Sequence, residues 1–244
     1  MVSMGLFYAA TALAMIPTLL LMYLLLRKYT YPAVENPYFS DPSFFMLFAI
    51  GLVAGTVMFL VYSYVMNSIV AVIMYSVIQV LLIVVCMNLK RYRGKSDSIF
   101  YGLGFGLGAG GSTGTGFIYY IAVSSDQLGG SVDAAGWVFL VVVALSMIFQ
   151  YSAVGVTVGE GIARHYPMQF AMQAMIYNLV YWVVFTIMLM NSDSGAIMYL
   201  MAGAALAISV FYLWFAYTKE IAKLVAEVDI QNGKKAKKRR IQQE

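Results

Sequence analysis

The chain has 244 residues, of which 62% are hydrophobic and only 11% are charged, and its formal net charge is +4. Soluble domains carry roughly a quarter charged residues, so this composition excludes an ordinary soluble protein and predicts a multi-span α-helical membrane protein. The single cysteine, Cys86, lies in an apolar stretch and excludes a disulfide within the chain.

Apolar stretches long enough to cross a bilayer as helices recur seven times along the chain. We expect membrane spans over residues 4–26, 43–66, 68–89, 98–122, 136–159, 167–190 and 194–217. No small-residue cleavage site follows the first stretch, which we therefore interpret as a retained helix rather than a signal peptide. Pro17 lies inside it and is expected to kink it, because proline cannot donate a helical hydrogen bond. The predicted fold class is all-α, a polytopic membrane helix bundle with seven transmembrane helices.

The fourth span carries the most distinctive pattern, YGLGFGLGAGGSTGTGFIYY over residues 101–120. At helical spacing its small residues form two stripes about 200° apart. The first comprises Gly102, Gly106, Gly110 and Gly114; the second comprises Gly104, Gly108, Ser112 and Gly116. Faces without side chains let two neighbouring helices approach closely. We therefore predict a Gly-rich central fourth helix, with its glycines packing against neighbours or docking a partner, and we expect Leu103, between the stripes, to matter less.

The basic residues indicate the orientation. All 15 Lys and Arg follow the odd-numbered spans or lie in the tail, so they fall on one side of the predicted bundle. The positive-inside rule makes that side cytoplasmic. The prediction is a multi-pass protein of the cell membrane with its N-terminus outside and its C-terminus inside.

We divide the chain into a seven-span transmembrane domain, residues 1–217, and a cytoplasmic segment, residues 218–244. Apolar residues recur in this segment with i, i+3, i+4, i+7 spacing, at Ile221, Leu224, Val225 and Val228. This spacing predicts an amphipathic helix lying on the membrane surface or on a partner. The basic run KKAKKRR, 234–240, predicts contact with anionic lipid headgroups; we expect no specific nucleic-acid partner.

Few residues offer chemistry. The 11 Asp and Glu residues lie in loops, at span ends or in the tail, which predicts no proton relay, carboxylate dyad or buried ion pair. His165 is the only histidine, so we expect no metal site and no cofactor. Residues 110–114 match the GxSxG pattern of serine hydrolases, but we expect Ser112 roughly two or three turns from His165, and favour a packing role.

Several polar side chains remain inside the predicted spans. Interhelical hydrogen bonds, worth about 1 kcal/mol each, are the favoured interpretation. A water-lined substrate cavity is the alternative, and its candidate residues are Gln79, Ser112, Gln150 and Asn178.

The order of features also resembles a known superfamily. A proline-bearing first span ends in RK, GLVAG stands in the second, KRYRGKSD follows the third, and the fourth and fifth carry SIFYGLGFGLGAG and FQYSAVGVTVGEGIARHY. Roughly over residues 10–217 this resembles the glutamyl intramembrane endopeptidases (the CAAX-protease-like, PrsW and YhfC families). It is also similar to the anterior-pharynx-defective scaffold subunit of gamma-secretase.

In the active families the third span carries paired glutamates, the glycine helix a further glutamate, and the next two spans a histidine each. The matching stretches here are 75–79, 105–111, 149–151 and 176–178, and they contain no acid and no histidine. The resemblance implies a member that lacks the catalytic residues, having lost the general base that activates water.

The predicted function is a non-catalytic, pseudoprotease-like scaffold that binds other membrane proteins or a hydrophobic ligand, as a subunit of a membrane complex. One alternative is a small-solute transporter or channel component, although no inverted repeat is visible in the sequence. A second alternative is an intramembrane protease with a non-standard site.

Overall fold

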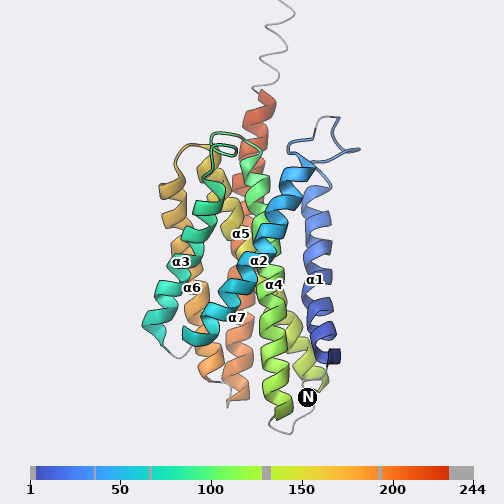
Figure 1. Cartoon of the computed structure of the whole chain (residues 1–244), viewed down its shortest axis with the longest axis vertical. Coiled ribbons are helices and arrows are strands. Elements are labelled where there is room, and N and C mark those ends of the chain that lie inside the picture. Colours follow the sequence, from blue (N-terminus) through green and yellow to red (C-terminus); the bar gives the residue numbers. More distant parts are fainter. Residues whose placement is uncertain (1–3, 36, 66–67, 128–132, 192–193, 231–244) are drawn as a thin grey trace, which may run out of the picture.

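The computed structural model describes residues 4–35, 37–65, 68–127, 133–191 and 194–230. These residues form a single bundle of long α-helices, elongated along the helix axes (Figure 1). The helices are α1 (Met4–Leu26), α2 (Asp41–Val65), α3 (Ile69–Met87), α4 (Ser98–Gln127), α5 (Ala134–Ala163), α6 (Pro167–Met190) and α7 (Gly195–Phe215). The all-α prediction is confirmed. Helix α1 runs through Pro17 without interruption.

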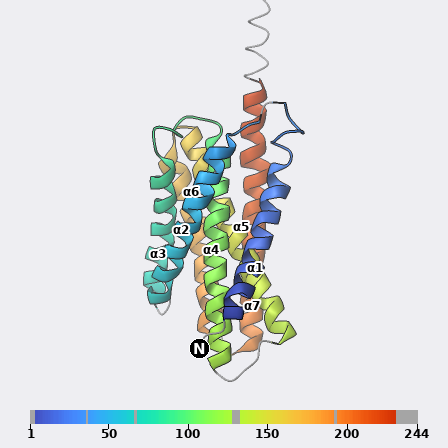
Figure 2. The same cartoon turned by 45° about the vertical axis from the view of Figure 1, so that its right-hand side comes forward.

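Six helical segments are long and apolar enough to cross a membrane, and α4 is not among them. Its glycines lower its hydropathy, although its 30 residues make it as long as α5. The position of α4 explains this composition: it lies at the centre of the bundle, among α1, α2 and α5 (Figures 1 and 2). Every residue from 98 to 111 is buried. A helix enclosed by protein does not need the apolar surface that lipid demands.

The first glycine stripe faces α5. A Cβ atom added to Gly106 would meet the carbonyl oxygen of Tyr151 and lie 2.8 Å from the Cα atom of Ser152. Gly102 and Gly155 meet reciprocally, each against the other's carbonyl oxygen. These neighbours are backbone atoms, which cannot rotate away as side-chain ends can. Glycine is therefore needed for α4 and α5 to pack at this distance.

The second stripe faces α2. A Cβ atom on Gly108 would meet the carbonyl oxygen of Phe48, and one on Gly104 would lie 2.9 Å from the ring of Phe44. Helix α2 contributes its own glycines, since a Cβ on Gly51 would meet the carbonyl oxygen of Phe105. The chain's own helices thus cover the six singled-out glycines, which are Gly102, Gly104, Gly106, Gly108, Gly110 and Gly114.

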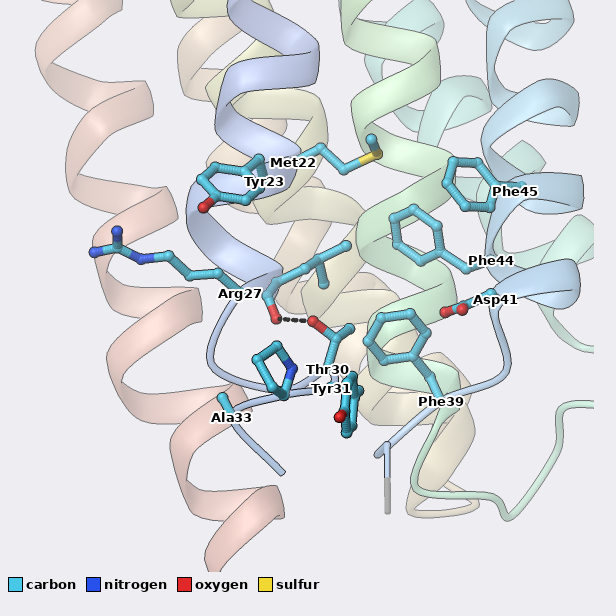
Figure 3. Close-up of a pocket in the computed structure, with 12 residues that line it drawn as sticks. Met22, Tyr23, Arg27, Thr30, Tyr31, Ala33, Phe39, Asp41, Phe44 and Phe45 are labelled. Carbon is cyan, nitrogen blue, oxygen red and sulfur yellow. Dashed lines mark hydrogen bonds between the residues drawn. The ribbon is translucent and has the colours of Figure 1, made fainter. Parts of the chain in front are cut away.

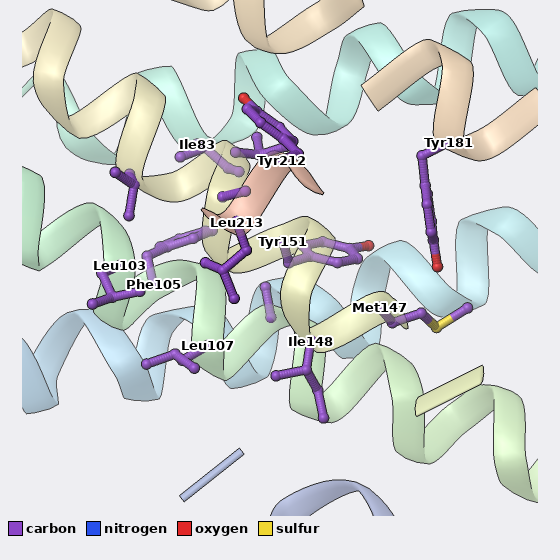
Figure 4. Close-up of a cluster of buried hydrophobic side chains, with 14 of the residues drawn as sticks. Ile83, Leu103, Phe105, Leu107, Met147, Ile148, Tyr151, Tyr181, Tyr212 and Leu213 are labelled. Atoms are coloured by element: carbon purple, nitrogen blue, oxygen red, sulfur yellow. The ribbon is translucent and has the colours of Figure 1, made fainter. Parts of the chain in front are cut away.

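Leu103 lies between the two stripes, where we expect substitution to matter less than at the glycines. Its side chain is 0% exposed. It lies with Phe105 and Leu107 of α4 in a cluster that also includes Ile148 of α5 (Figure 4). Deleting a buried leucine side chain leaves a cavity, so Leu103→Ala should also be destabilising. The faces of α4 that lie between the two glycine stripes are therefore buried too.

The predicted tail helix continues α7 rather than forming a separate element. A π-helix, Ala216–Ile221, follows α7 directly, and helical backbone extends to residue 230. Ile221 and Leu224, from the predicted apolar face, are buried. The Tyr38 hydroxyl donates to Asp229 Oδ1 at 2.7 Å, a bond that raises the pKa of Tyr38. The segment thus packs on the end of the bundle; the basic run 234–240 lies outside the described residues.

Candidate functional site

Three of the four predicted cavity residues meet in one buried cluster between α3, α5 and α6. Asn178 Nδ2 donates to Gln79 Oε1 at 2.7 Å and to the Ser76 carbonyl oxygen at 3.0 Å. Gln150 Nε2 donates to Asn178 Oδ1 at 3.4 Å, and Trp182 Nε1 donates to Gln79 Oε1 at 2.7 Å. We call Gln79, Gln150 and Asn178 the amide cluster; all three are buried.

Beside the amide cluster, two tyrosines and a threonine form further polar contacts that reach α4. The hydroxyl oxygens of Tyr75 and Tyr151 lie 3.4 Å apart. Thr113 Oγ1 lies 3.2 Å from the Tyr151 hydroxyl and 3.0 Å from the carbonyl oxygen of Gly55. Gln79 Nε2 and Gln150 Oε1 find no partner among the described residues. Side-chain hydrogen bonds thus connect residues of five helices, α2 to α6, in this region.

The side chains of the amide cluster form hydrogen bonds and do not titrate near neutral pH. Amides accept and donate hydrogen bonds, and a phenol has a pKa near 10. A general base near neutral pH is usually an imidazole or a carboxylate. Among the described residues, the side chains hydrogen-bonded in this cluster include neither.

Ser112, the fourth predicted cavity residue, lies apart from the amide cluster. Its hydroxyl donates within α4, to the carbonyl oxygens of Gly108 and Ala109, and it packs beside Gly55 of α2. His165 lies in the α5–α6 connection, with its ring against Gly94. Ser112 is about 20 Å along α4 from that end of the bundle, at 1.5 Å per residue. The structure therefore does not bring serine and histidine together.

The hydrogen bond between Asn178 and Gln79 predicts energetic coupling. Asn178→Leu and Gln79→Leu should each lower the free energy of unfolding by about 1–2 kcal/mol, since each leaves buried polar groups unpaired. The double variant should lose about 1 kcal/mol less than the sum of the two. Equilibrium unfolding in mixed micelles measures this, and strict additivity would contradict the coupling.

The acids give a correction. We expected no buried ion pair, yet Glu160 is 4% exposed and its Oε1 lies 2.6 Å from Nε of Arg164, the residue that directly follows α5. Arg164 Nη1 also contacts Glu227 Oε2 at 3.1 Å, on the helix that continues α7. The prediction failed because this continuation of α7 runs beside the end of α5 and buries its acidic side chain. The spacing of four residues between Glu160 and Arg164 could have predicted this ion pair, because residues i and i+4 are neighbours on a helix.

A second buried carboxyl lies nearby. Glu220, 5% exposed, accepts hydrogen bonds from Thr157 Oγ1 at 2.8 Å and from Gln173 Nε2 at 3.3 Å. The Tyr212 hydroxyl donates in turn to Thr157 Oγ1 at 2.9 Å. Directly or through Thr157, the Glu220 carboxyl thus links side chains of α5, α6 and α7 to the π-helix.

A groove of about 590 Å³ opens between α1 and α2 (Figure 3). The groove forms because α1 and α2 contact α4 at separate positions. Helix α1 packs there through Ala14 and Thr18, which face Gly114 and Gly111, whereas α2 packs through Phe44. Nearer the connection between them, α1 and α2 leave space that residues 30–33 and Phe39 line at one end (Figure 3).

The lining of this α1–α2 groove is amphipathic. Its walls are apolar, with Met22 and Leu26 on α1, Phe44 and Phe45 on α2, and Phe39 before α2. Its rim is polar, with Arg27, Thr30, Tyr31 and Asp41. No sequence pattern predicted the groove, because α1 and α2 are both uniformly apolar. The groove arises only because the two helices contact α4 at separate positions.

Comparison of the chain with protein-family models, with curated proteins and with solved structures finds no match in any of the three. The fold supports an assignment to a broad class of protein, without a family. On its six long apolar helical segments, the chain is a polytopic integral membrane protein.

Proposed function

We propose that this chain is a non-catalytic membrane protein that binds a hydrophobic membrane component in the α1–α2 groove. The groove is the observation that carries the proposal. Ligand sites in proteins are typically concave, mostly apolar, and about 300–1,000 Å³ in volume, with a few placed polar groups. The groove has this character at about 590 Å³. It lies between two helices that expose apolar side chains, such as Tyr23 and Phe45, as lipid-facing helices do.

The amide cluster supports the non-catalytic part of the proposal. Three of the stretches that the resemblance matches to active-site positions, 75–79, 149–151 and 176–178, supply its residues. An amide can form the hydrogen bonds of a carboxylate or imidazole but cannot take up a proton near neutral pH. We propose on this ground a pseudoprotease-like, YhfC-like fold in which hydrogen bonds between helices replace catalytic groups.

The surface supports the proposed orientation and mode of assembly. Every Lys and Arg of the described residues lies at the end of the bundle where α1 ends and α2 begins (Figure 1). By the positive-inside rule we propose that this end is cytoplasmic, with seven spans and the N-terminus outside. Because both glycine stripes are covered, a partner in a membrane complex would use the outer faces of the bundle or the groove.

Photolabelling tests the groove. A diazirine-bearing fatty acid should label peptides spanning residues 22–45 saturably in detergent-solubilised protein. Met22→Trp narrows the groove and should abolish this labelling. Leu24→Trp is the matched control, because Leu24 lies on the same helix, is 43% exposed and does not line the groove. Labelling that never saturates, or that is spread equally over the exposed face of α3, would contradict the proposal.

A further inference from the structure

The rim of the α1–α2 groove carries two opposite charges that form no ion pair with any residue the structure describes. Arg27 follows the last residue of α1, and Asp41 is the first residue of α2; both are exposed. Both line the groove, Arg27 at the end of α1 and Asp41 at the start of α2, and the Arg27 side chain extends outward, away from Asp41 (Figure 3). Within the part of the chain that the structure describes, the salt bridges are those of Arg164, so neither Arg27 nor Asp41 has such a partner.

Next to this rim the groove is apolar. Leu26 and Phe44 are buried in its walls, and Phe45 is 54% exposed on its flank. A matching ligand therefore has an apolar chain that fits between α1 and α2 and a polar end that carries both a negative and a positive group. The Thr30 hydroxyl already donates to the Leu26 carbonyl oxygen at 3.3 Å, so toward a ligand it can only accept a hydrogen bond.

A phospholipid with an amine-bearing headgroup has this chemistry. Guanidinium groups bind phosphate through charge-assisted hydrogen bonds, and an ammonium group can donate to a carboxylate. A headgroup with phosphate but no amine would bring negative charge toward Asp41 without neutralising it. A purely apolar helix in the groove would cover Asp41 and leave its carboxylate unpaired, which is costly.

We infer that the groove binds one zwitterionic, amine-bearing phospholipid, with an acyl chain between α1 and α2, its phosphate at Arg27 and its ammonium group at Asp41. This inference rests on the proposed function of the groove and names its ligand class. The positive-inside placement of the same end assigns the lipid to the cytoplasmic leaflet.

Native mass spectrometry of the full chain tests the headgroup assignment. The protein is exchanged into mild detergent with equimolar phosphatidylethanolamine and phosphatidylglycerol of identical acyl chains. The amine-bearing lipid should be retained about threefold over the other, the ratio expected for one exposed ion pair. Asp41→Asn should bring this ratio to about one with total lipid binding kept, whereas Arg27→Gln should reduce retention of both lipids. Asp133→Asn, at the other end of the bundle, is the control and should leave the ratio unchanged.

The outcomes separate the two proposals. Saturable lipid binding that Met22→Trp abolishes, but with a headgroup ratio that Asp41→Asn does not alter, would overturn the phospholipid assignment and leave the groove as a hydrophobic site. Retention of a membrane helix in place of lipid would overturn the same assignment. No saturable labelling or retention of any kind would overturn the proposed function as well.

Discussion

Gly106→Leu should lower the free energy of unfolding by about 3 kcal/mol or prevent folding altogether. Overpacking a tight interior costs about 1–3 kcal/mol, occasionally more. We expect the upper end here because the added side chain would meet the carbonyl oxygen of Tyr151 and the Cα atom of Ser152. Relief of that contact requires α5 to move away from α4. Thermal unfolding in detergent and the yield of monodisperse protein both report the loss.

A glycine in the same bundle provides the control. Gly203 lies in α7 with nothing within 4 Å of the position a Cβ atom would take. Gly203→Leu should be neutral or slightly stabilising, because leucine favours helix over glycine by roughly 1 kcal/mol. Equal losses at Gly106 and Gly203 would show that a general effect of leucine, and not the α4–α5 contact, causes the instability.

Helix α4 shows how much of this fold is readable in a sequence. The spacing of its glycines predicted a central helix with two close neighbours, because helices that pack closely need small residues at the contact. The helix ends were predicted less well. Helix α4 extends to Gln127 and α5 begins at Ala134 and ends at Ala163, beyond the apolar stretches of 98–122 and 136–159. Hydropathy locates the apolar part of a helix. Helical hydrogen bonds continue into the polar residues that follow, so the helix ends lie beyond the apolar stretch.

The amide cluster and the α1–α2 groove were less predictable, for different physical reasons. Gln79, Gln150 and Asn178 could be recognised singly as polar residues in apolar spans, but their convergence depends on how α3, α5 and α6 pack. Ser112 looked equivalent to them and lies elsewhere, bonded within its own helix. The groove is a property of the space between helices, which no local pattern encodes.

Arg164→Gln should lower the free energy of unfolding by about 2 kcal/mol. Removing one partner of a buried ion pair costs about 3–5 kcal/mol, because the remaining charge is buried without compensation. The value is reduced here because the Arg164 side chain is 24% exposed, so that solvent screens part of its charge. The same change also removes the contact to Glu227, which joins α5 to the helix that continues α7. Unfolding in mixed micelles at neutral pH measures the loss.

The double variant Glu160→Gln/Arg164→Gln decides the cause. If the cost of Arg164→Gln comes from the uncompensated Glu160 carboxylate, neutralising that carboxylate should recover at least half of the lost stability. Arg93→Gln is the control for removing a cation, since Arg93 is exposed and bonds the neutral side chain of Asn88; it should change stability by less than about 0.5 kcal/mol. A double variant as unstable as Arg164→Gln would instead assign the cost to the Glu227 contact, and the C-terminal helix would then owe its position to Arg164.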